Sequence, residues 1–246
     1  SYELKGRRQI NVDGESVDEV IAQPRTFAVP ILVKGATQAA IDTAMADLAP
    51  LLNPDQGDCR IIVSRTLANG NTRQREIVAR YVSGYEGIAI KRDSQRNAIV
   101  PLVFRAYYPW WRDIGAVERF HSEQFLDAIG AGVNVVAAVN EGDVRTWPKI
   151  GVWGAATSIQ NVELANLTTG QTIRLVQVIE AGHVLSIDSD PATQSVLLDN
   201  FNIYSSTVDP FSDFWPLEPG LNWLMFRGLG ANGFFSLRWE HRYNTC

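Results

Sequence analysis

The sequence predicts an all-β fold with one helix, divided into two β domains, and three observations carry this prediction. Short runs of β-branched and aromatic residues recur along the 246-residue chain, with turn residues between them. One segment alone, 37–49, has apolar residues at helical spacing. The segment 235–243 alternates between large and polar side chains, which is typical of a strand with one buried face.

Composition excludes several classes of protein. Hydrophobic residues make up 46% of the chain and charged residues 20%, which indicates a folded protein and not a disordered one. The formal net charge of -5 argues against a sequence-independent nucleic-acid binder, which needs a basic face. We find no apolar run long enough to cross a bilayer and no signal peptide at Ser1. The two cysteines, Cys59 and Cys246, fit a small buried thiol and a loose terminal thiol better than a disulfide framework.

The first half begins with two expected strands, 4–12 and 25–33, joined by the acidic segment 13–19 as an exposed loop. A helix follows, with Thr37 as its N-cap and an end near Ala49, because Pro50 disfavours a helical residue before it. Its apolar stripe consists of Ile41, Met45, Leu48 and Leu52. We interpret this stripe as a helix packed on a sheet.

Asn69-Gly70 is the strongest hairpin signal in the chain and predicts paired strands at 59–64 and 73–85. The basic residues of this hairpin are Arg60, Arg65, Arg73, Arg75 and Arg80. A nucleic-acid site lacks the stacking aromatics that it would need, so we favour solvated positions or ion pairs with a neighbouring subunit. A further strand is expected at 98–107, where Pro101 indicates an edge or a bulge.

An aromatic cluster at 107–111 closes the first domain, and we place the boundary near Glu118, with domains at 1–118 and 119–246. The cluster has two interpretations. Exposed Tyr and Trp rings stack on sugars, but a plug between domains or an intersubunit anchor is the favoured reading.

The second half predicts strands throughout, at 133–139, 147–153, 161–167, 171–179, 184–188, 195–204, 221–226 and 235–243. Many short strands with turns between them indicate a sandwich or barrel. The turn formed by Pro216, Pro219 and Gly220 leads into 221–226, which reads as a strand buried on both faces.

No catalytic or cofactor site is predicted. The segment Gly228 to Gly233 matches G-x-G-x-x-G, but a strand follows it and not the helix that holds a pyrophosphate, so we interpret it as a hairpin loop. Asp188 and Asp190 are expected to cap a turn. The histidines His121, His183 and His241 have no nucleophile nearby in the sequence, and no zinc spacing exists.

Several motifs occur in an order that resembles the siphophage distal tail (Dit-type) components. The first are Lys34-Gly35, Leu52-Asn53-Pro54 with Gly57, and the segment from Phe104 to Trp111. The second half adds Trp147 to Trp153, Leu185 to Asp188, and the segment from Phe214 to Phe226. The resemblance therefore covers both halves of the chain.

This resemblance implies a tail-tube-like β-barrel or sandwich followed by a galectin-like β-sandwich. It implies a homo-oligomer, a hexameric ring, that joins the tail tube protein to the baseplate hub or receptor-binding proteins at the virion tail tip. The expected interaction residues are Arg73, Arg75, Tyr108, Trp110 and Trp111. Charge reversal at Arg73 and Arg75 is expected to impair assembly and to leave the fold intact.

The alternative is a carbohydrate-binding, lectin-like module of a tail or cell-surface protein, because the galectin-like sandwich is a lectin fold. Alternation in the last strand sends Trp239 and His241 to the face opposite Arg238 and Glu240, which disfavours this group as a sugar site. A tail-borne hydrolase is weaker still, because no acid or nucleophile pair is present.

Overall fold

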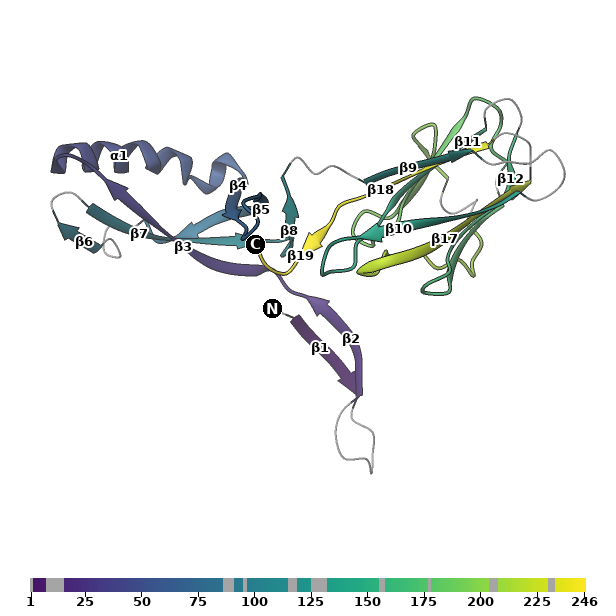
Figure 1. Ribbon diagram of the computed structural model, residues 1–246, viewed down its shortest axis with the longest axis horizontal. Helices are drawn as coiled ribbons and strands as arrows, with labels where there is room; N and C mark the ends of the chain where they lie inside the picture. Colours follow the sequence, from purple (N-terminus) through teal and green to yellow (C-terminus); the bar gives the residue numbers. More distant parts are fainter. Residues whose placement is uncertain are drawn as a thin grey trace. The chain divides into compact units, whose positions relative to one another are not determined.

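A computed structural model describes residues 2–7, 16–85, 91–94, 97–114, 119–124, 132–154, 158–176, 178–203, 208–229 and 233–246. They divide into two compact units, Ser1–Trp111 with Cys246 and Arg112–Thr245. Figure 1 shows a sheet with one helix in the first unit and two facing sheets in the second. The all-β class with one long helix is confirmed for these residues. The expected boundary near Glu118 lies outside the described residues and stays a prediction.

The first unit is built on a sheet in which β7 (Asn97–Ala106) lies between β5 (Thr72–Ser83) and β3 (Arg25–Lys34). β4 (Cys59–Thr66) pairs with β5, and β6 (Lys91–Ser94) pairs with β7. β1 (Tyr2–Arg7) and β2 (Ser16–Ala22) form a separate two-stranded sheet. The expected loop at 13–19 is therefore wrong from Ser16 onward, because pairing with β1 satisfies the backbone of this acidic segment.

The helix α1 (Gln38–Leu51) lies along the sheet, as Figure 1 shows. The predicted N-cap is confirmed, because the Thr37 hydroxyl accepts a hydrogen bond from the N–H of Ala40 at 3.2 Å. The helix continues to Leu51, so the predicted end at Ala49 is wrong. Pro50 sits in the last turn and interrupts the hydrogen bonding only one residue before the helix ends, and the N–H of Leu52 closes the turn on the Ala49 carbonyl.

The sheet accommodates two prolines that face each other. Pro30 of β3 is in register with Pro101 of β7. At a non-hydrogen-bonded pair the two residues exchange no N–H bonds, so the missing N–H of each proline breaks no bond between these strands. On its other side, β7 pairs with β5 at residues 103–105 and with β6 at residues 97–99. Pro101 therefore lies at the change of partner within an interior strand. Of the two expected positions the edge is wrong, whereas the pairing on both sides of Pro101 shows the register shifts of a bulge or irregularity. The predicted hairpin is confirmed: β4 and β5 join through Gly70, which has φ 82°.

The second unit is a sandwich of two antiparallel sheets. The four-stranded sheet has the order β10 (Gly132–Asn140), β17 (Gly220–Leu229), β12 (Gln160–Asn166) and β13 (Gln171–Leu175). The six-stranded sheet has the order β16 (Phe201–Asn202), β15 (Ser195–Leu198), β14 (Val184–Asp188), β11 (Lys149–Gly154), β18 (Gly233–Trp239) and β9 (Arg119–Gln124). The remaining short elements are η1 (Pro54–Gln56), β8 (Trp111–Asp113) and β19 (Arg242–Tyr243).

The core of the sandwich lies between the two sheets. Trp215, Phe226 and Phe235 are fully buried in it, and the rings of Phe226 and Phe235 stack with centroids 3.7 Å apart. The alternation predicted for the last long strand is confirmed, because Trp239 is buried and Arg238 is exposed. The alternation therefore directs one face of β18 into the core between the two sheets and the other face away from it.

Two expectations for β17 are wrong. The strand is not buried on both faces: Leu221 and Trp223 are about half exposed, whereas Asn222 and Leu224 are buried. The reason is that the outer face of the four-stranded sheet has no cover among the described residues of its own unit. The glycine segment 228–233 is also not a hairpin, because β17 and β18 belong to different sheets. Residues 230–232 of that segment lie outside the described residues.

Candidate assembly surfaces

The start of β17 is held by the side chain of Asn222. Its Oδ1 accepts from the N–H of Glu218 at 3.0 Å, and its Nδ2 donates to the carbonyls of Glu218 and Gly220 at 2.7 and 3.1 Å. Because Asn222 is buried, these bonds satisfy its amide oxygen and nitrogen, which water cannot reach. This Asn therefore fixes the Pro-Gly turn and aims the residues that follow, which include the exposed Trp223.

Two further buried asparagines anchor the same loop. The amide of Asn166 donates to the Pro216 carbonyl at 2.9 Å, and the amide of Asn140 donates to the Leu217 carbonyl at 3.2 Å. His241, which is also buried, accepts from the N–H of Glu141 through Nδ1 at 3.1 Å. The loop before β17 is therefore rigid, and the surface that β17 presents is preorganised.

One part of the outer face of the four-stranded sheet is apolar. Its exposed apolar side chains project from β10, from β17 and from the turn after β12, and they are Val135, Val139, Leu221, Trp223 and Leu167. Beyond them the same face is charged, because the register sets Glu163 beside Arg227 and Arg174. The register places Val139 opposite Leu221, so these side chains are neighbours across the strands. A contiguous apolar face on a folded domain is typical of a surface that another protein covers.

The first unit presents an open sheet edge at β3. Among the described residues the sheet order ends at β3, which pairs there with β7 alone. At the facing prolines the main-chain groups point away from the partner strand, and residues two positions away have the same orientation. Ala28 and Leu32 therefore direct their N–H groups to the open edge. A ten-residue edge strand of this kind is a template for a strand of another chain.

The arginines of the β4–β5 hairpin pair mainly within the hairpin. The guanidinium of Arg60 binds the buried Glu76 carboxylate, with Nε and Oε2 2.9 Å apart, and Arg80 binds Asp58 at 2.9 Å. Arg73 is exposed, but Arg75 is only 5% exposed. Burial corrects the expectation that charge reversal at Arg75 leaves the fold intact, because a reversed charge would be desolvated there. An interaction role for Arg73 stays a prediction.

The aromatic cluster divides into exposed and buried members. Tyr107 and Tyr108 are more than half exposed, and the guanidinium of Arg105 lies 5.7 Å from the ring centre of Tyr107. Trp110 is half-buried, whereas Trp111 is buried and lies 6.2 Å from Phe27, centre to centre. Trp111 is therefore part of the packing of its own unit, and its side chain does not offer an open ring. Contact roles for Tyr108 and Trp110 stay predictions.

The carboxylates of Asp188 and Asp190 cap a turn, as the sequence predicts. Asp188 accepts from the N–H of Asp190 and from the Thr193 hydroxyl, and Asp190 accepts from the N–H of Ala192 and pairs with Arg242 at 2.9 Å. These contacts stabilise the turn, and Lys149 of β11 pairs with Asp188 at 3.6 Å. Among the described residues, no group of three or more His, Cys, Asp or Glu side chains could hold a metal ion.

The two cysteines are free. Cys59 is half-buried, its thiol donates to the Ala79 carbonyl at 3.0 Å, and burial raises its pKa above the ordinary value. A thiol of this kind is less reactive than an exposed one. Cys246 is exposed. No helix of the described residues is long and apolar enough to cross a membrane.

The chain is similar to known proteins in sequence over part of its length and in fold over nearly all of it. Residues 141–243 match the family model described as the siphovirus-type tail component, C-terminal domain. The fold is similar to the crystal structure of the Dit protein of phage SPP1, with a TM-score of 0.62, 17% sequence identity, and coverage of 97% of this chain and 87% of that one. That protein is described as a paradigm of the hub adsorption apparatus in phages that infect Gram-positive bacteria. No curated protein matches the chain.

The family match covers residues 141–243, less than half of the chain, and the structural match extends the likeness in fold to both units. The resemblance to Dit-type distal tail components, predicted from motifs in both halves, is confirmed. The C-terminal sandwich is accordingly of the galectin-like kind that the resemblance implies.

Proposed function

We propose that this protein is a ring-forming adaptor at the tip of a siphophage tail, where it joins the tail tube to the baseplate or receptor-binding apparatus. The observation that supports this most is the likeness to a hub protein along 97% of the chain, across both units. A protein that acts as an adaptor needs binding surfaces and no reaction centre. The surfaces described above meet that need.

A ring requires a heterologous contact, in which one face of a subunit meets a different face of the next. The first unit has two such faces, because β3 and β4 each pair on one side only within the part of the chain that the structure describes. In the proposed ring the edge of β3 meets the neighbouring first unit, and the number of subunits implied by the resemblance is six. The apolar face of the four-stranded sheet then remains on the second unit for other tail proteins.

The test is to locate the protein in the virion. Phage carrying a small epitope tag after Cys246 should bind gold-labelled antibody at the end of the tail opposite the head, as electron microscopy would show. Label along the whole tail would instead indicate a tube protein. Complete absence of label from intact virions, with tagged protein detected in the lysate, would contradict the proposal.

A further inference from the structure

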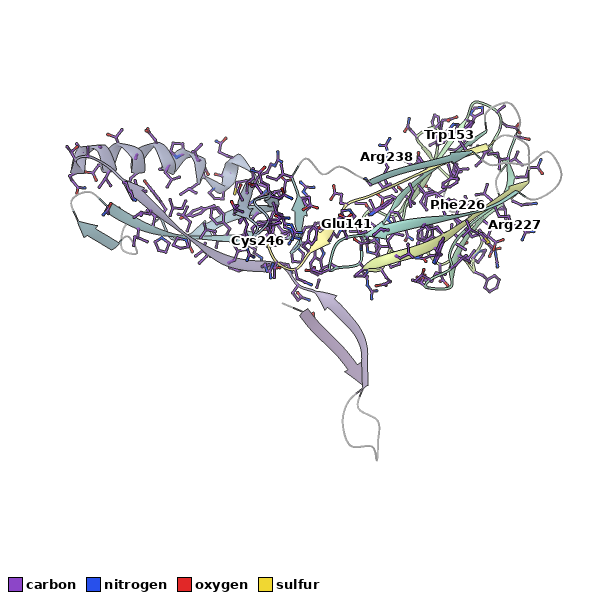
Figure 2. All side chains as sticks on the ribbon, in the orientation of Figure 1. Glu141, Trp153, Phe226, Arg227, Arg238 and Cys246 are labelled. Carbon is purple, nitrogen blue, oxygen red and sulfur yellow. The ribbon has the colours of Figure 1, made fainter. Side chains whose placement is uncertain are left out.

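The outer face of the six-stranded sheet is hollowed by a trough of about 680 Å³, which lies on the face opposite the sandwich core. Its lining comes from β11, β14, β15 and β18, and Figure 2 labels Trp153 and Arg238 on this sheet. These four strands have neighbours on both sides, so the trough offers side chains and no free backbone edge. The cross-strand register arranges those side chains in three rows.

The floor of the trough is a row of small residues. Gly151 of β11 lies between Ser186 of β14 and Ser236 of β18. A Cβ added at Gly151 would stand 2.8 Å from the Ser236 hydroxyl and 3.7 Å from the Trp153 ring, so the missing side chain creates space beside both. Each hydroxyl can donate and accept a hydrogen bond. The floor is therefore shallow, polar and uncharged.

One wall of the trough consists of Trp153 and Val184, and Phe234 lies behind the Trp153 ring outside the lining. Trp153 lies opposite Phe234 on one side and Val184 on the other. The Trp153 and Phe234 rings are stacked, 5.8 Å apart with an angle of 16° between their planes, and both side chains are partly exposed. Since the sandwich core lies on the other face of the sheet, this wall adds nothing to the core. It provides a rigid apolar surface beside the hydroxyls of the floor.

The other wall carries charges of both signs, which partly cancel. Lys149 lies between Asp188 and Arg238, and its ammonium nitrogen is 3.6 Å from the Asp188 carboxylate. The pair supplies donors and acceptors together, and Arg238 adds further donors. Because one positive charge is matched by the carboxylate, the wall does not form the cluster of cations that an anionic polymer needs.

We propose that this trough binds a neutral oligosaccharide. Sugar rings combine an apolar face with a rim of hydroxyl groups, which suits an aromatic wall opposite a polar one across a small-residue floor. An extended peptide fits less well, because peptides recognised by sheets add to an open edge and this part of the sheet has none. The trough belongs to the second unit alone, so binding does not depend on ring formation.

The test uses the purified full chain on an array of neutral, sialylated and sulfated glycans, followed by calorimetric titration with the best neutral oligosaccharide. We expect selective binding to neutral glycans, with a Kd on the order of 1 mM or tighter. Absence of saturable binding to every neutral glycan overturns the proposal. Preference for sulfated or sialylated glycans also overturns it, because the charged wall would then dominate.

Two variants assign the binding to the trough. Trp153→Ala removes the aromatic wall, and Ser186→Val fills the floor at an exposed position of β14, where a β-branched residue suits the strand. Each should weaken binding at least about tenfold. The matched control is Phe211→Ala, which removes an exposed aromatic side chain that does not line the trough and should leave the affinity unchanged. If Ser186→Val keeps both its fold and its affinity, the trough is not the site.

Discussion

The two units of this chain differ in how completely their β-strands are covered. The second unit closes two sheets over a continuous core, in which residues such as Trp215 and Phe235 are fully buried. The first unit leaves a ten-residue edge strand, β3, in which no residue is buried. Sheet edges of this length are a hazard unless a partner covers them. The difference is what the proposed ring requires, because there the edge of β3 is covered by a neighbouring subunit.

The largest expected effect tests the closed unit. Trp239→Ala should lower the free energy of unfolding by about 3–5 kcal/mol, because the side chain is 6% exposed and belongs to the sandwich core. The neighbouring Arg238→Ala should change it by less than about 0.5 kcal/mol, since that side chain is exposed. Urea unfolding of the purified monomer measures both. Equal losses would show that the strand register is wrong.

A second comparison tests the hairpin of the first unit. Arg75→Glu should destabilise the fold by about 3 kcal/mol or more, because it places a reversed charge at a buried position. Arg73→Glu, two residues earlier on β5, should change stability by less than about 0.5 kcal/mol. Thermal unfolding followed by circular dichroism separates the two. An Arg75→Glu protein as stable as the parent would contradict the buried placement of this side chain.

The edge of β3 should affect assembly more than stability. Ala28→Pro removes an N–H that points to the open edge, so we expect association to weaken at least about tenfold while the subunit stays folded. Val29→Pro is the control, because it removes a bond to β7 and should unfold the first unit. Analytical ultracentrifugation and circular dichroism give the two readouts. Unchanged association of the Ala28→Pro protein would remove β3 from the contact.

The smallest expected effect is a pH dependence at the end of the β14–β15 pair where His183 precedes β14 and Asp199 follows β15. His183 hydrogen-bonds Asp199, which raises the pKa of His183 above 6.5. The N–H of Val184 and then His183 lower the pKa of Asp199 below 3.8. The His183 contribution to stability is fully present below pH 6.5 and is lost as pH rises through its raised pKa. The Asp199 contribution is present above pH 3.8 and is lost as pH falls through its lowered pKa.

The exposed pair should therefore stabilise the protein most between about pH 4 and 6.5. Thermal midpoints of the parent and of His183→Gln, measured across pH, should differ slightly within this window and converge above it. Glu180 is the nearby charge that also favours protonated His183, so Glu180→Gln is the matched control. A difference between parent and His183→Gln that grows toward alkaline pH would contradict this assignment.

Local signals in the sequence predicted the elements that depend on local chemistry. The Thr37 cap, the turn at Gly70 and the alternation through Trp239 each follow from a few neighbouring residues, and each is confirmed. Burial of Arg75 and exposure of Trp223 could not be predicted in this way. Both depend on which distant segment covers a given face of a sheet, and a strand pattern does not identify that segment.

The trough was missed for the same reason. Its floor residues, Gly151, Ser186 and Ser236, come from three strands that are far apart in the sequence and meet only in the folded sheet. A weak signal exists, because each strand has a small residue at its midpoint between larger ones. That signal is meaningful only after the register is known.

The most direct test of the central claim, that this chain acts by closing a ring, is the mass and symmetry of the purified full-length protein. Native mass spectrometry and electron microscopy should show a closed assembly of six subunits whose first units surround a channel. A monomer at all concentrations, or an open filament that never closes, would contradict the account.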